Sequence, residues 1–159
     1  MLRGNRHVGK GPEWEMVRVL IDWAHEHGWK AFPEISTSDG CYIDLVLLDT
    51  KQQTYGVELK VGQALRAARQ ARCHHLNCDY AVIALPERSA ARFHERNQEE
   101  AYKHLGILIV DKKRRDCRWL RMPAEPTRDR LPSNIREMFD VKPLLTCEGH
   151  KFEAAFASE

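Results

Sequence analysis

The feature that most constrains the fold is a pair of apolar segments that carry charged residues in their interiors. The first, YIDLVLL at 42–48, is almost entirely apolar and contains Asp44. The second, TYGVELKV at 54–61, alternates apolar residues with polar or small ones and contains Glu58 and Lys60. Such runs predict β-strands, and the first is apolar enough for a strand that is buried on both faces. The connector between them is short enough for a hairpin.

Charged residues inside buried strands need partners, because a buried charge is costly unless it is paired or bound to a metal. With the hairpin centred on Lys51, Asp44 and Glu58 stand opposite each other, with Cβ atoms about 5 Å apart. Two carboxylates at that distance repel unless a cation lies between them, and hard oxygen ligands favour Mg²⁺ or Mn²⁺. Lys60 shares a face with Glu58 and could position or help deprotonate a water at the metal. We therefore expect a divalent-metal site at this hairpin.

The segments around the hairpin predict an α/β fold, in which helices flank a mixed central sheet. The expected helices span 12–27, 63–76 and 89–104, and the expected strands span 30–35, 42–48, 54–61, 79–85, 106–110 and 117–122. At 100° per residue, the first helix collects its apolar residues on one side. Glu13 breaks this pattern because it falls near the middle of the apolar face, whereas Glu15 lies on the solvent side.

Composition limits the class of protein. The 159 residues fit one domain, a hydrophobic content of 43% is enough for a core, and a net charge of +2 excludes a strongly basic, histone-like protein. Five cysteines, no signal-peptide pattern and no apolar run of about 20 residues lead us to expect a soluble, cytoplasmic protein with no membrane partner. We divide the chain into a basic lead-in at 1–10, a core domain at 11–122 and an appendage at 123–159 with a short helix at 133–139.

The motif residues resemble those of a known superfamily. Ile43-Asp44, followed after a hairpin by ELK at 58–60, resembles the motif of the PD-(D/E)XK nucleases. The elements over 11–110 match the α-β-β-β-α-β order of the restriction-endonuclease-like core of that superfamily. The sequence departs from the motif at its proline, which Ile43 replaces here, as in many relatives.

This resemblance implies specific roles for the motif residues. Asp44 and Glu58 would bind the metal, joined by the carbonyl of Leu59, and Lys60 would be the catalytic lysine. Glu13 matches a first-helix glutamate that joins the metal site in archaeal Holliday-junction resolvases, which belong to the same superfamily. Glu13 would then be an accessory catalytic carboxylate.

Basic and polar residues after the motif are candidate contacts to nucleic acid. Relatives in the superfamily often use a polar residue early in the second helix to contact phosphate, and Gln63 occupies that place. The candidates are Gln63, Arg66, Arg69, Lys112, Lys113 and Arg114. For each residue alone, a solvated surface position remains an equal alternative.

Two further groups are weaker candidates. Glu34, near the end of the first strand, could approach the metal site. The segment CHHLNC at 73–78 contains cysteine and histidine, which bind zinc, but its spacing matches no standard zinc motif, and ordinary packing is the default interpretation.

Together these features favour a metal-dependent endonuclease that hydrolyses DNA phosphodiester bonds with Mg²⁺ or Mn²⁺, in DNA repair, recombination or phage-related DNA processing. A junction resolvase is one version of this hypothesis, and it requires a homodimer that places two sites on two strands. The alternatives are an RNA endonuclease and a non-catalytic nucleic-acid-binding or interaction module on the same fold.

Overall fold

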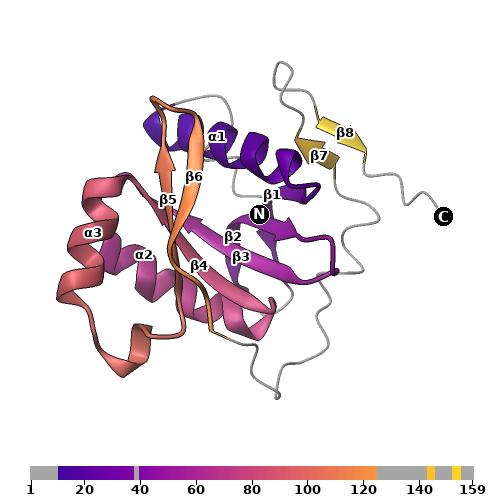
Figure 1. The fold of residues 1–159 in the computed structure, drawn as a ribbon. Helices are drawn as coiled ribbons and strands as arrows, with labels where there is room; N and C mark the ends of the chain where they lie inside the picture. Colours follow the sequence, from indigo (N-terminus) through magenta and orange to yellow (C-terminus); the bar gives the residue numbers. More distant parts are fainter. Residues whose placement is uncertain (1–10, 38–39, 125–142, 146–151, 155–159) are drawn as a thin grey trace.

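A six-stranded mixed sheet forms the centre of the computed structural model, which describes residues 11–37, 40–124, 143–145 and 152–154 (Figure 1). Its strands lie side by side in chain order: β1 (Lys30–Ser36), β2 (Tyr42–Leu48), β3 (Thr54–Leu59), β4 (Tyr80–Leu85), β5 (Gly106–Asp111) and β6 (Asp116–Arg121). The pairs β1–β2, β2–β3 and β5–β6 are antiparallel, whereas β3–β4 and β4–β5 are parallel. The predicted mixed sheet is therefore confirmed.

Helices cover both faces of this sheet. The helical elements are α1 (Pro12–Glu26), α2 (Ala64–Ala71), η1 (Arg72–Leu76), α3 (Glu87–Arg96) and η2 (Glu100–Tyr102). The buried residues of α1 pack against one face of the sheet, and those of α2 and α3 pack against the other (Figure 1). A separate two-stranded pair, β7 (Pro143–Leu145) and β8 (Phe152–Ala154), adjoins β1. In the described part of the chain, no helix is long and apolar enough to cross a membrane.

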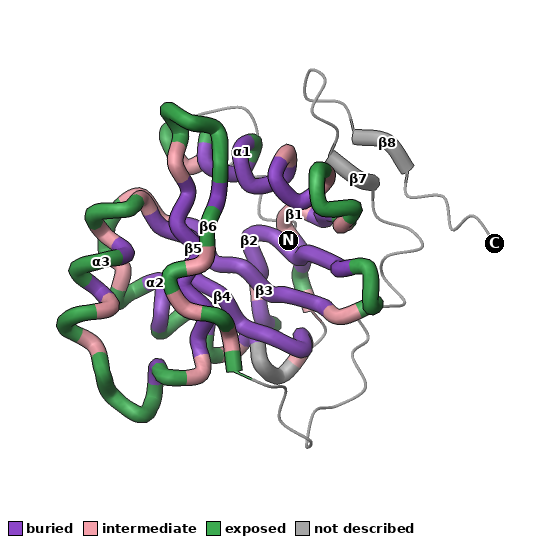
Figure 2. Tube along the Cα trace, in the orientation of Figure 1, coloured by how far each residue is buried: buried purple, intermediate pink, exposed green. Residues whose placement is uncertain are grey.

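Helix α1 is amphipathic as predicted. Pro12 occupies its first turn, where a missing N–H costs nothing. Glu15 is exposed, as predicted. The strands that the helix covers are buried (Figure 2). The buried residues of the helix are Trp14, Met16, Val17, Val19, Leu20, Ile21, Trp23 and Ala24.

Asp49 fixes the turn between β2 and β3. Its Oδ1 accepts hydrogen bonds from the backbone N–H groups of Lys51 and Gln53, both at 2.9 Å. Its Oδ2 accepts a hydrogen bond of 3.1 Å from the hydroxyl of Tyr55. An aspartate that bonds to backbone groups just after it is typical of tight turns, and here it sets the register of the hairpin.

Several predicted boundaries were wrong for local reasons. The strand at 54–61 ends at Leu59, and the helix at 63–76 ends at Ala71 and continues as the 3₁₀ helix η1. The helix at 89–104 spans Glu87–Arg96 instead, because Ser89 does not cap it: the Ser89 hydroxyl donates to the carbonyl of Val61. The lead-in at 1–10 and the helix at 133–139 lie outside the described residues.

Candidate functional site

The strand register aligns three acidic residues across β1, β2 and β3. The β2–β3 pairs run from Leu48↔Thr54 to Leu45↔Val57, so the next position places Asp44 opposite Glu58, as predicted. On the other side, Glu34 lies between two β1–β2 pairs and therefore stands across from Asp44. Glu34 has a positive φ of 52°, which is unusual for a non-glycine residue in a strand and interrupts the ladder at this row.

Asp44 is buried and tied to the neighbouring strand. Its relative exposure is 6%, and its Oδ2 accepts a hydrogen bond of 3.0 Å from the backbone N–H of Leu59. This bond joins the last residue of β3 to the β2 carboxylate. It satisfies one carboxylate oxygen and fixes the side chain at the point where β3 ends.

Glu58 is also buried, at 4% exposure, and it contacts His74 of η1. The Glu58 Oε2 and His74 Nε2 atoms are 3.2 Å apart. Gly56 makes this approach possible, since a Cβ atom at that position would lie 2.8 Å from the Cβ of His74. No local sequence pattern indicates this contact, because it depends on how η1 packs onto β3.

The surroundings of His74 favour a positive charge on its ring. Burial alone would lower the pKa of His74, but hydrogen bonds to Cys73 and Glu58 and the charges of both groups outweigh it and raise the pKa to about 9. The second ring nitrogen, Nδ1, faces sulfur: it lies 3.4 Å from Sγ of Cys41 and 3.5 Å from Sγ of Cys73.

Lys60 follows the end of β3 and lies next to α1. Its backbone N–H donates to the carbonyl of Ala84 on β4, which fixes its position beside the parallel strand. Its Nζ lies 3.9 Å from Oε1 of Glu13, and both side chains are partly exposed, at 20% and 26%. The structure therefore brings Glu13 to the motif lysine, on the inward side that the helical pattern predicted.

The predicted acids do not form the tightest group of ligands. In the described residues, the group of three cysteine, histidine or acidic side chains with ligand atoms within 4.8 Å of one another is Cys41, Cys73 and His74. Asp44 and Glu58 still offer the hard oxygen donors that Mg²⁺ and Mn²⁺ prefer, from facing strand positions, and the carbonyl of Leu59 is adjacent in the chain. This donor set fits the cation that the motif implies.

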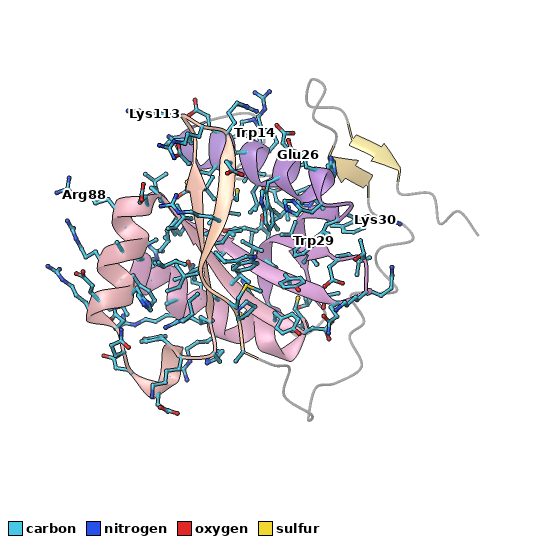
Figure 3. All side chains as sticks on the ribbon, viewed as in Figure 1. Trp14, Glu26, Trp29, Lys30, Arg88 and Lys113 are labelled. Atoms are coloured by element: carbon cyan, nitrogen blue, oxygen red, sulfur yellow. The ribbon has the colours of Figure 1, made fainter. Side chains whose placement is uncertain are left out.

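The candidate nucleic-acid contacts form two separate groups. Gln63 begins α2 in a left-handed conformation, and Arg66 and Arg69 are exposed on the same helix, directly after the motif. The other group lies on the β5–β6 turn, where Lys113 projects outward (Figure 3).

Two basic residues of the β5–β6 turn make ion pairs with acids near them. Lys112 Nζ lies 3.5 Å from Glu15 Oε2 on α1, and Arg114 lies 4.0 Å from Asp111. These pairs partly neutralise the turn, so the α2 group offers the less compensated positive charge beside the motif.

Comparisons with known proteins report on the fold. No protein-family model and no curated protein matches the chain. A solved structure of the SPO1766 protein of unknown function from Silicibacter pomeroyi is similar to this chain, with a TM-score of 0.60 and 21% sequence identity. The match covers 78% of each chain. The chain therefore shares its α/β architecture with that protein.

Proposed function

We propose that this protein is a metal-dependent nuclease that hydrolyses DNA phosphodiester bonds on a restriction-endonuclease-like core. The observation that carries the proposal is the placement of Asp44 and Glu58, two buried carboxylates at facing positions of β2 and β3. Lys60 follows directly at the open end of β3. Two buried acids side by side oppose folding unless positive charge offsets them. His74 offsets part of the charge of Glu58, and a divalent cation held by both carboxylates would offset the charge of the pair.

Asp44, Glu58 and the carbonyl of Leu59 would hold Mg²⁺ or Mn²⁺. The chemistry that a bound divalent cation supplies is polarisation of a phosphodiester and a lower pKa for a water molecule. The hydrogen bond from Leu59 N–H to Asp44 orients the Asp44 carboxylate before any ligand arrives. Such preorganisation avoids a reorganisation cost when the substrate binds.

Lys60 and Glu13 act on the substrate side of this site. Both side chains reach solvent, so an incoming phosphate can approach the Lys60 ammonium. A positive charge at this place stabilises the negative charge that develops on the phosphate oxygens and helps to orient the attacking water. Glu13 Oε1 lies 3.9 Å from the lysine Nζ and would hold the ammonium in place.

The exposed face of α2 supports a path for the nucleic-acid backbone. Arg66 and Arg69 extend from the helix that begins four residues after Lys60, and Gln63 stands at its start. Contacts from these side chains to phosphates would place the substrate without reading its sequence.

The experiment is a cleavage panel of duplex, single-stranded, flap and four-way-junction DNA, with RNA as a separate arm. Each substrate is incubated with Mg²⁺, Mn²⁺ or EDTA. We expect metal-dependent cleavage of DNA that falls about 100-fold or more in Lys60→Ala, the effect of removing one charge-stabilising group. Lys103→Ala, which alters an exposed lysine that pairs with Glu100 and is not a candidate contact, is the control and keeps full activity.

Two results would contradict the proposal. If RNA is cut and DNA is not, the substrate assignment is wrong and the chain is a ribonuclease. If no substrate is cut while nucleic acid still binds, the fold serves as a binding module.

A further inference from the structure

We propose that Cys41, Cys73 and His74 form a second metal site, selective for a thiolate-seeking divalent ion such as Zn²⁺. Its three ligands differ from those of the hard-oxygen site at Asp44, although Glu58 borders both sites, and the inference holds whether or not the chain cleaves DNA. It is carried by the convergence of three ligand atoms from two distant segments and by the orientation of the histidine ring.

The three ligand atoms face one another. Sγ of Cys41 lies 2.7 Å from Sγ of Cys73, and Nδ1 of His74 lies 3.4 Å and 3.5 Å from the two sulfurs. Zinc binds sulfur at about 2.3 Å and imidazole nitrogen at about 2.0 Å, so the ligands of one ion lie up to roughly 4 Å apart. The three atoms therefore enclose a position within bonding reach of a single ion.

The ring of His74 is oriented as a metal ligand requires. Histidine ligands usually donate their second ring N–H to a carboxylate, which fixes the tautomer and leaves the other nitrogen free to bind. Here Nε2 points at Oε2 of Glu58, 3.2 Å away, and Nδ1 points at the two sulfurs. Because His74 is fully buried, this orientation cannot come from contact with bulk water.

Separate local interactions hold the three ligands. Cys41 lies just before β2, where its N–H donates to Oγ1 of Thr37 at 3.1 Å and its carbonyl accepts from the same hydroxyl at 3.0 Å. Cys73 and His74 lie in η1, which packs closely on Gly56 of β3. The ion would thus connect the start of β2 to the helical segment that covers β3.

Two adjustments accompany binding. The sulfurs must separate by about 1 Å to reach tetrahedral spacing around one ion. The thiol of Cys73 donates to the carbonyl of Gln70 at 3.0 Å, and this proton, the thiol proton of Cys41 and the proton on Nδ1 of His74 must all leave for solvent when the ion binds. Cys73 is only partly buried, so its side chain has room to move and its proton has a route to solvent. Three protein ligands leave a fourth position for water.

The test is cobalt and zinc binding to the full chain, purified under a phosphine reductant and freed of metal by a chelator. In excess Mg²⁺, which occupies the hard oxygen donors, we expect one Co²⁺ or Zn²⁺ per chain and, with Co²⁺, a thiolate-to-metal charge-transfer band that zinc abolishes. Cys41→Ser, Cys73→Ser and His74→Ala should each lose the band. Cys117→Ser is the matched control, because Cys117 is buried in the core beneath α1, and it should keep both the band and the stoichiometry.

A further variant tests the role of Glu58 without removing any of the three ligands of this second site. Glu58→Gln should weaken metal binding by about 10- to 100-fold, as loss of an orienting carboxylate does, and leave the charge-transfer band in place. Circular dichroism of each metal-free variant checks that its fold is intact.

Absence of the band in the reduced wild-type chain would overturn the proposal, as would a band that persists in the Cys41 and Cys73 variants. A Cys41–Cys73 disulfide found by mass spectrometry, together with no metal affinity after reduction, would assign the pair to redox chemistry instead.

Discussion

Gly56 shows how one residue without a side chain can set the geometry of a site. A Cβ atom there would lie 2.8 Å from the Cβ of His74 and 3.1 Å from Sγ of Cys78, closer than side chains tolerate. The absence of that atom lets η1 approach β3 until His74 meets Glu58. The contact between Glu58 and the cysteine–histidine group therefore depends on this glycine.

Replacing Gly56 with alanine should push η1 away from β3. We expect the free energy of unfolding to fall by about 1–3 kcal/mol, the usual cost of an overpacked core. Urea denaturation measures the change. Gly62→Ala is the control, since a Cβ atom at Gly62 meets nothing within 4 Å and should leave stability nearly unchanged. Equal stability of the two variants would contradict close packing of η1 on Gly56.

Cys117 gives a pH-dependent prediction. Burial, followed by the charges of Asp116 and Glu26, raises the pKa of the Cys117 thiol from 9.0 to about 12. The folded state therefore holds this proton up to a higher pH than the unfolded state does. The contribution of the thiol to the free energy of unfolding is complete below pH 9 and is lost as the pH rises toward 12.

Between pH 9 and 12, the free energy of unfolding of the wild type should fall with each pH unit by about 1 kcal/mol more than that of Cys117→Ala. Urea denaturation of both proteins at several alkaline pH values gives the difference. Parallel pH profiles would show that the thiol ionises as easily in the folded state as in the unfolded state.

The residue pattern predicted the alignment of Asp44 with Glu58 but not the approach of Cys41 to Cys73 and His74. Asp44 and Glu58 could be aligned from the sequence, because a short hairpin between two apolar strands leaves few registers. The side of the helix on which Glu13 lies could also be predicted, because helical periodicity is regular. The approach of Cys41 to His74 joins positions more than thirty residues apart through the packing of η1, and no local pattern encodes it.

At the scale of elements, the β2–β3 hairpin depends on one turn residue. Asp49 accepts three hydrogen bonds, two from backbone N–H groups and one from Tyr55, and is itself buried. Its loss should affect the register that brings Asp44 opposite Glu58. Asp49 therefore influences how Asp44 and Glu58 are placed through the geometry of the hairpin.

Asp49→Ala should lower the free energy of unfolding by roughly 2–4 kcal/mol, since hydrogen bonds to a charged group are strong and the freed donors are partly buried. Thermal and urea denaturation measure the loss. Lys51→Ala, an exposed change in the same turn, is the control and should have little effect. A small effect of Asp49→Ala would mean that strand packing alone sets the register.

Element types were easier to predict than element ends. The apolar strands and the amphipathic first helix follow from residue periodicity. The end of α3 does not, because it depends on Asn97, whose side-chain amide donates to the carbonyl of Phe93. The helical segment that positions His74 changes from α to 3₁₀ geometry at Arg72, where it meets the sheet, and only tertiary packing determines that change.

At the scale of the whole molecule, the distribution of charge matters more than its sum. The net charge is only +2, and several basic residues pair with acids on α1, including Arg115 with Asp22 at 2.9 Å. Arg66 and Arg69, by contrast, are exposed on α2 directly after the motif. The proposed nucleic-acid path therefore runs along α2.

If this path is correct, Arg66→Ala and Arg69→Ala should each weaken DNA binding and reduce the slope of log affinity against log salt by about 1. Arg115→Ala should change the slope less, since its charge is already offset by Asp22. Fluorescence anisotropy at several salt concentrations measures these slopes. A larger effect of Arg115→Ala would place the DNA over the β5–β6 turn instead.

DNA cleavage and DNA binding by the wild type and Asp44→Asn would show whether the chain is a metal-dependent nuclease. Asparagine preserves the size of the side chain but removes the charge that would hold the divalent cation. The nuclease account predicts that single-turnover cleavage in Mg²⁺ falls about 100-fold or more while DNA affinity in EDTA is unchanged. Asp22→Asn, an α1 aspartate away from the motif, should retain full cleavage. Cleavage by Asp44→Asn at the wild-type rate would contradict the account.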